Sequence, residues 1–129
     1  MKKYLRKIHQ WLGLISGLLV LIIALTGCLY AFQEEIQNAT QPYRFSQKER
    51  ADFLFPSQLE QIARKHLPNK QLHSIKYHQD GKSAEAIFYH YQPTYYYIVY
   101  INPYSGKILH TQNMQEGFFP FILKGHFYL

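Results

Sequence analysis

The sequence is poor in cysteine and in acidic residues, and both shortages narrow the possible classes of protein. Cys28 is the only cysteine among 129 residues, which excludes an intrachain disulfide, a cysteine-based zinc site and a thioredoxin-like pair. Eight acidic residues stand against 14 Lys and Arg, so the formal net charge is +6. This length suits one small domain with or without an anchor, and it excludes a large multidomain enzyme.

The positive charge is concentrated at the N-terminus. Residues 1–33 hold four basic residues and no acid, whereas residues 34–129 hold ten basic residues against eight acids. A protein that binds nucleic acid carries its basic excess on the folded domain, where the excess meets phosphates. We therefore expect no nucleic-acid partner.

Charged residues are absent from the 22 positions between Trp11 and Phe32. A helix of this length spans roughly 33 Å, which is enough to cross about 30 Å of hydrocarbon. The sequence therefore predicts a transmembrane helix at about residues 11–32, within an N-terminal segment 1–35, with the lipid bilayer as its partner. Basic residues precede the run and Glu34 and Glu35 follow it, so the positive-inside rule predicts a cytoplasmic N-terminus and an extracytoplasmic domain.

Two other interpretations of this apolar run stay open from the sequence. A cleaved secretory signal usually has a shorter apolar stretch of about 7–15 residues before its cleavage site. The four residues Leu25–Cys28 (LTGC) match a lipobox, in which Cys28 would be acylated. The apolar residues that follow Cys28 favour an uncleaved anchor, because lipoproteins usually turn polar at that point.

Small residues in the run indicate partner helices. Gly13 and Gly17 form a G-x-x-x-G pair, a spacing that lets helices approach closely in lipid. Such partners would be further helices of the same protein, a second copy or another subunit.

Residues 36–54 show no clear hydrophobic period and include Pro42, so we predict a connector. A helix is predicted to open at Phe55–Ser57, with Ser57 and Glu60 spaced as in a capping box. Apolar residues then recur at near-helical spacing, at Leu59, Ile62, Ala63 and Leu67. This helix would cover one face of a sheet.

The region after this helix has the pattern of an antiparallel sheet. Turn sequences at Asp80-Gly81, Gln92–Thr94 and Asn102–Gly106 separate runs rich in β-branched and aromatic residues. The predicted strands are residues 72–77, 83–91, 95–101 and 107–111. The predicted fold class is therefore α+β, with one helix packed on a three- to four-stranded antiparallel sheet in a domain of residues 55–112.

The C-terminal segment, residues 113–129, is unusual because it ends in the apolar and aromatic sequence GFFPFILKGHFYL. One interpretation is the juxtamembrane start of a second helix that returns to the bilayer, in a truncated member of a longer architecture. The other is a tail that docks on the membrane surface through its aromatic side chains.

Two stretches of the chain resemble a known family. Ile8–Gly17 (IHQWLGLISG), Ala24–Gly27 (ALTG) and Phe32–Glu35 (FQEE) resemble the first helix of the PepSY-associated transmembrane family. Val99–Leu109 resembles the end of a PepSY domain, with Asn102 at a usual aspartate and Ser105 at a usual threonine. The resemblance covers most of the chain and implies a PepSY-like periplasmic domain anchored in the bacterial inner membrane.

The resemblance also implies a role and a cofactor. Members are often iron-regulated, and some resemble ferric-siderophore reductases that hold haem between transmembrane histidines. By resemblance, His9 and His126 are the candidate haem ligands, because each lies near one end of an apolar segment. They would lie roughly 30 Å apart on opposite sides of the bilayer, so they would not share one iron. Each would need a partner histidine, and we expect haem only in a multi-helix assembly, since family members generally have more helices than this chain.

The remaining sequence offers no other site. Five histidines lie in the predicted soluble domain without metal-ligand spacing, so no metal site is predicted. No nucleophile–base motif, phosphate loop or carboxylate pair occurs, so no catalytic residue is assigned. Three hypotheses follow: an inner-membrane PepSY protein of iron or siderophore uptake within a haem-containing reductase, a non-catalytic periplasmic binding or regulatory module, and an acylated lipoprotein.

Overall fold

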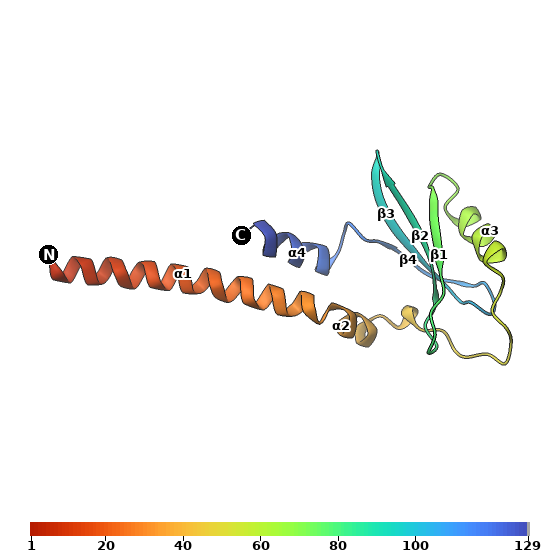
Figure 1. Cartoon of the computed structure of the whole chain (residues 1–129), viewed down its shortest axis with the longest axis horizontal. Helices are drawn as coiled ribbons and strands as arrows, with labels where there is room; N and C mark the ends of the chain where they lie inside the picture. The colour runs from red at the N-terminus through yellow and green to blue at the C-terminus, as the bar shows by residue number, and fades with distance from the viewer. Residues whose placement is uncertain (129) are drawn as a thin grey trace. The chain divides into compact units, whose positions relative to one another are not determined.

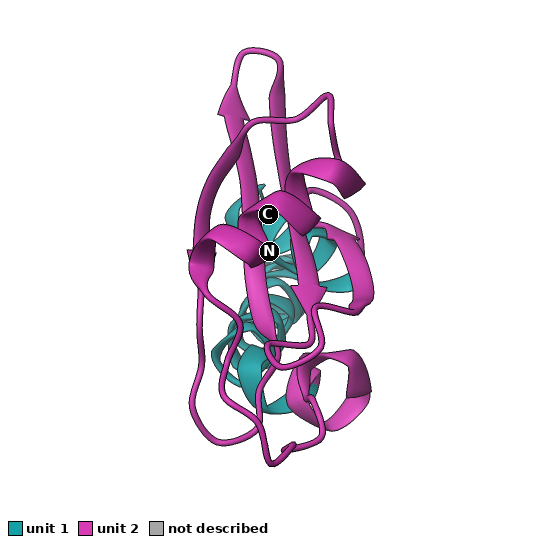
Figure 2. Ribbon diagram, turned by 90° about the vertical axis from the view of Figure 1, so that its right-hand side faces the viewer, with its two compact units in different colours: residues 1–36, 118–129 teal, residues 37–117 magenta. Residues whose placement is uncertain are grey.

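The computed structural model describes residues 1–128 and divides the chain into two compact units, drawn in teal and magenta in Figure 2. One unit consists of residues 1–36 together with the C-terminal segment that starts at Phe118. The other consists of Gln37–Gly117.

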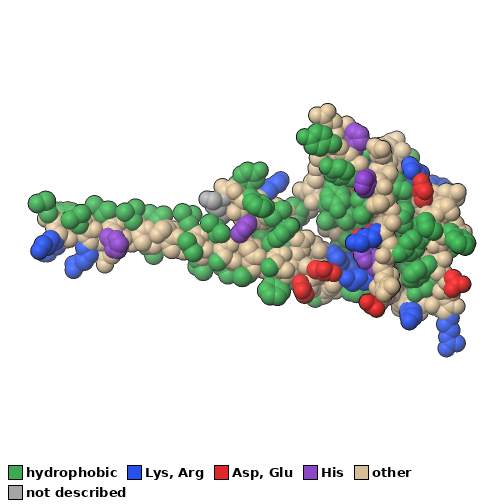
Figure 3. Space-filling model, viewed as in Figure 1, with side chains coloured by type: hydrophobic (Ala, Val, Ile, Leu, Met, Phe, Trp, Pro, Cys, Tyr) green, Lys and Arg blue, Asp and Glu red, His purple; other side chains and the backbone are tan. Residues whose placement is uncertain are grey.

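Helix α1 runs from Lys2 to Ala31 and buries none of its residues within the chain. Figure 3 shows apolar side chains along its whole length and basic side chains gathered at its N-terminal end. A core helix of a soluble domain buries one apolar stripe, whereas a helix exposed to lipid needs an apolar surface all round. Within residues 1–128, α1 is the one helix long and apolar enough to cross a membrane, as predicted.

A second helix, α2 (Gln33–Thr40), follows α1 after one residue. Phe32 leaves the helical region, with φ −95° and ψ 19°, but its N–H still donates to the carbonyl oxygen of Cys28. Glu34 and Glu35 then occupy the first turn of α2, where acidic side chains favour the helix dipole. The structure thus differs from the irregular connector expected at residues 36–54, because its first five residues are helical.

The C-terminal segment forms helix α4 (Phe118–Tyr128), which lies alongside α1 (Figure 1). Phe119 and Ile122 are buried. Pro120 is tolerated because it stands in the first turn, where backbone N–H groups have no partner within the helix. The segment is thus helical from Phe118 to Tyr128, and Leu129 lies outside the described residues.

The second unit contains a four-stranded antiparallel sheet in the order β1-β2-β3-β4. Its strands are β1 (Leu72–Lys76), β2 (Ala84–Tyr91), β3 (Thr94–Ile101) and β4 (Ile108–Asn113). Asp80 and Gly81 both have positive φ angles, 64° and 74°, as expected for a turn built on Asp-Gly. The predicted α+β class and the sheet are confirmed.

Helix α3 (Pro56–His66) covers one face of this sheet (Figure 1). Successive side chains along β2 point to opposite faces of the sheet. One set therefore lies against α3, as predicted, and the other set lies on the opposite face. Complete burial of Leu59 alone contributes about 2 kcal/mol. The buried core consists of Leu59 and Ala63 of α3 with Ala84, Ala86, Phe88, Val99 and Ile101 of the sheet.

The start of α3 differs from the prediction. The helix begins at Pro56, and the side-chain Oε1 of Gln58 accepts a hydrogen bond from the N–H of Phe55 at 2.9 Å. The predicted capping box of Ser57 and Glu60 is therefore wrong, and Glu60 instead pairs with Arg64 at 2.8 Å. The reason is Pro56, whose fixed φ favours the first helical position and moves the cap to the preceding residue.

The turn between β3 and β4 fits tightly under α3. Asn102 Oδ1 accepts hydrogen bonds from the N–H groups of Tyr104 and Ser105, at 2.9 and 3.3 Å. Gly106 has φ +75°, and a Cβ atom there would lie 2.6 Å from Cδ1 of Ile62 on α3. Glycine is thus favoured by its backbone angle, and its lack of a side chain leaves room for the terminal methyl group of Ile62.

Candidate functional site

The imidazole of His126, on α4, lies in a seat on α1 that we call the Thr26–Gly27 seat. Its Nδ1 atom is 3.1 Å from Thr26 Oγ1 and 3.2 Å from the carbonyl oxygen of Ile23. A Cβ atom at Gly27 would lie 3.2 Å from Cε1 of His126. Thr26 therefore supplies a hydrogen-bond partner, and Gly27 leaves the space that the ring occupies.

The hydrogen bonds of the seat favour one tautomer of His126. The Ile23 carbonyl oxygen has no proton to donate, and the Thr26 hydroxyl donates to the carbonyl oxygens of Ile22 and Ile23, at 2.8 and 3.0 Å. Both partners of Nδ1 then act as acceptors, which favours the tautomer with the proton on Nδ1. In that tautomer the lone pair lies on Nε2, which makes no hydrogen bond with any residue in the described part of the chain.

The seat lies well inside the apolar segment. Thr26 precedes Phe32 by six residues, which corresponds to about 9 Å along a helix. An ionisable side chain at such a depth is costly in lipid unless a partner satisfies it. The sequence pointed to the Thr-Gly pair and to His126 separately, but it gave no sign that the three residues meet.

His9 lies in the N-terminal part of α1 and is exposed. It precedes Gly27 by 18 residues, which is five full turns, so both residues lie on the same face of α1, about 27 Å apart along its axis. The structure thus places the two candidate ligands at different levels of one helix face and does not bring them together. Between these levels, Gly13 and Gly17 have no atom within 4 Å of where a Cβ would stand, so this part of the face is open.

The family comparison agrees with this architecture. The sequence profile described as the PepSY-associated TM region matches residues 6–129. The chain belongs to this family. No curated protein matches it.

Membership of the PepSY-associated family makes the chain a membrane protein, with α1 in contact with the lipid bilayer. The matched region extends from the basic N-terminal stretch through the sheet to α4, so it includes both His9 and His126.

The five histidines of the sheet unit have separate partners. Within residues 1–128, no three His, Cys, Asp or Glu side chains are grouped so that they could hold a metal ion. These imidazoles contact hydroxyl, carboxylate or aromatic groups instead. The partners are Thr111 for His66 (2.8 Å), Glu85 for His78 (3.3 Å), Tyr89 for His73, Tyr95 for His90 and Tyr43 for His110.

A short segment covers part of the sheet face opposite α3. The 3-10 turn Pro42–Arg44 places the Tyr43 ring in a stack on His110, with ring centroids 4.0 Å apart, and 5.0 Å from Tyr100. The Tyr43 carbonyl oxygen accepts a hydrogen bond from Ser83 Oγ at 2.9 Å. Burial raises the pKa of Tyr100 to about 12, because the charged phenolate is disfavoured away from water. No hydrophobic period in residues 36–54 signalled this arrangement.

Proposed function

We propose that this PepSY-associated protein holds haem in the bacterial inner membrane, as part of a transmembrane reductase of iron or siderophore uptake. The observation that carries the proposal is the His126 imidazole, which is held through Nδ1 inside the apolar segment with its Nε2 lone pair free. An axial haem ligand must be a neutral imidazole that offers one ring nitrogen to the iron.

The hydrogen bonds of the Thr26–Gly27 seat suit this role. Histidines that bind metals almost always donate their other ring N–H to a carbonyl, carboxylate or water, which fixes the tautomer and the ring orientation. Ile23 and Thr26 provide such acceptors at 3.2 and 3.1 Å. His126 would hold the iron, and the bound haem would supply one-electron transfer in a site kept dry by the bilayer.

His9 supports a second haem site, at a different depth in the membrane on the same face of α1. The spacing of about 27 Å between His9 and Gly27 is too large for one iron, so each histidine would serve a separate haem. Each haem needs a second imidazole, which further helices of the protein, a second copy or another subunit would provide. The open surface at Gly13 and Gly17 leaves room for such a neighbour.

The charges at the two ends of the apolar run support the orientation that this role needs. Lys2, Lys3, Arg6 and Lys7 precede the run, whereas Glu34 and Glu35 follow it. Basic residues stay in the cytoplasm, so the sheet unit would lie in the periplasm. An alkaline phosphatase reporter inserted after Gly117 should then be active, whereas a cytosolic reporter at that position should be inactive.

The test is the absorption spectrum of the full chain purified from haem-supplied membranes as an intact assembly, with any partner subunit retained. We expect a Soret band that is reduced in His9→Ala and in His126→Ala, and unchanged in His110→Ala, a matched control in the sheet unit. Added imidazole should restore part of the band lost in His126→Gly, which separates lost ligation from misfolding. Absence of haem from the wild-type protein, or equal haem content in all variants, would refute the proposal.

A second candidate is a non-catalytic periplasmic module that binds or regulates a partner. It is favoured by exposed aromatic side chains on the sheet, with Tyr89 and Tyr91 43% and 72% exposed. Haem-free wild-type protein that still co-purifies with a periplasmic partner, and loses it in Tyr89→Ala, would support this candidate over the first.

A further inference from the structure

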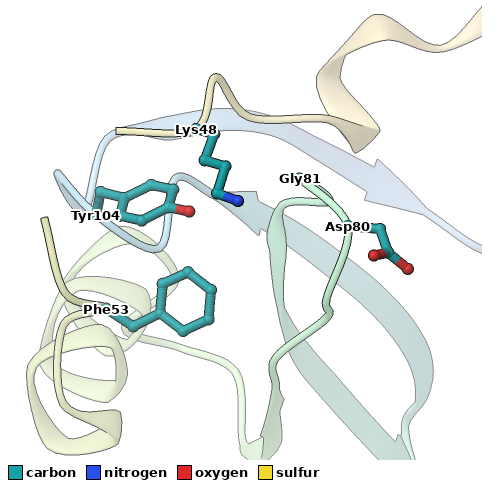
Figure 4. A pocket seen from close by; sticks show the side chains of 5 residues that line it. All are labelled: Lys48, Phe53, Asp80, Gly81 and Tyr104. Atoms are coloured by element: carbon teal, nitrogen blue, oxygen red, sulfur yellow. The ribbon is translucent and has the colours of Figure 1, made fainter. Parts of the chain in front are cut away.

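The sheet unit contains a pocket of about 430 Å³ that is separate from the membrane histidines. Three segments that are distant in sequence form it: the stretch before α3, the turn between β1 and β2, and the turn between β3 and β4. Such a volume is within the range of sites for small organic molecules. The lining residues, shown in Figure 4, are Lys48, Phe53, Asp80, Gly81 and Tyr104.

Two aromatic rings form the apolar part of this pocket. Phe53 and Tyr104 have ring centroids 5.0 Å apart and planes tilted by 58°. Phe53 also stacks on Tyr77, whose hydroxyl donates a 2.6 Å hydrogen bond to the carbonyl oxygen of Leu54. The Phe53 ring is therefore fixed in position although it is 43% exposed, so its free surface is available to a ligand.

The polar groups of the pocket favour an anion. Figure 4 shows Lys48 extending into the space beside Tyr104, whereas the carboxylate of Asp80 points away from the other labelled side chains. Lys48 forms no salt bridge with any residue from 1 to 128. The ammonium of Lys48 and the hydroxyl of Tyr104 both offer protons to an acceptor, and the carboxylate among the lining residues, that of Asp80, points away from them.

We propose that this pocket binds a small planar anion, of which an aromatic carboxylate is the simplest example. The aromatic ring of the ligand packs on Phe53 and Tyr104, and its carboxylate accepts hydrogen bonds from Lys48 and from the Tyr104 hydroxyl. This inference does not depend on haem, since all the residues involved belong to the sheet unit.

The test uses the full chain in nanodiscs, labelled with nitrogen-15, with benzoate as the probe. Amide signals of Gly81 and Tyr104 should shift and saturate with a Kd of about 1 mM, which is typical of a fragment-sized ligand. Benzylamine, which has the same ring and the opposite charge, should not shift them. Lys48→Met should weaken benzoate binding about five- to tenfold, and Phe53→Leu should weaken it as well, whereas Lys65→Met on the exposed side of α3 should leave it unchanged.

Three results would overturn the proposal. Benzylamine could shift the same signals with equal affinity, Lys48→Met could bind benzoate as well as the wild type, or benzoate could shift only signals of α1, which would report partition into lipid. An unchanged amide spectrum outside the pocket in Lys48→Met and Phe53→Leu shows that these variants are folded, so that a change in affinity reports on the pocket.

Discussion

Replacement of Gly106 by alanine tests how the β3–β4 turn fits against α3. A left-handed backbone angle costs a residue with a Cβ about 1–2 kcal/mol. The new Cβ would also lie 2.6 Å from Ile62 Cδ1 and 3.1 Å from Leu54 Cδ1. Both are terminal methyl groups that can turn aside, so this overpacking falls at the low end of its usual range, about 1 kcal/mol. Gly106→Ala should therefore destabilise the sheet unit by about 2–3 kcal/mol.

Gly81→Ala is the matched control for this substitution. Gly81 has nearly the same φ, +74°, but its nearest neighbour is an ordinary 3.7 Å from the added Cβ. The free energy of unfolding of Gly81→Ala should fall only by the cost of the left-handed backbone angle, about 1–2 kcal/mol. The difference between the two variants, about 1 kcal/mol, isolates the steric contact with Ile62 and Leu54.

The assay is thermal unfolding of the full chain followed by near-ultraviolet circular dichroism, which reports on the packed aromatic side chains. A loss of 1 kcal/mol lowers the Tm of a unit of this size by about 4–8 °C. Gly106→Ala should melt below Gly81→Ala by at least about 4 °C. Equal Tm values would refute the close approach of the turn to α3.

Three further predictions concern other parts of the chain. Gly27→Val should displace the His126 ring and lower the haem content, whereas Gly13→Val, which meets open space, should retain His126 in its seat; equal haem content would contradict the role of Gly27. The raised pKa of Tyr100 means that its neutral form stabilises the fold below pH 10 and that this stability is lost as the pH rises from 10 towards 12. Tyr100→Phe should lose less stability over that range in denaturant titrations, and an unchanged dependence would contradict the burial. Cys28→Ser should leave the intact mass, apart from the substitution, and the membrane fraction unchanged, because Cys28 lies within a continuous helix; a wild-type chain that carries an acyl group on Cys28 would support the lipoprotein instead.

Local patterns in the sequence predicted most of the sheet unit. The alternation in β2 and the Asp80-Gly81 turn act between near neighbours, so the sequence contains enough information to place them. The apolar run from Trp11 to Phe32 likewise predicted α1. These patterns gave no sign of features that tertiary contacts decide, such as the turn Pro42–Arg44, which is ordered by Ser83 and by the rings of the sheet.

The Thr26–Gly27 seat shows the same limit for the candidate site. Thr26 and His126 are 100 residues apart, so no local period relates them. The family resemblance drew attention to each residue, but only the arrangement of α1 and α4 shows that one orients the other. A threonine followed by glycine in an apolar helix provides both an acceptor and a space, but this pattern does not indicate which side chain occupies them.

The most direct test of the proposed site is the protonation of the His126 ring in the full chain in lipid. Nitrogen-15 spectroscopy of the labelled imidazole should find the proton on Nδ1, with Nε2 unprotonated in the haem-free protein and bound to iron when haem is present. A proton on Nε2, with Nδ1 as the acceptor, would contradict the account.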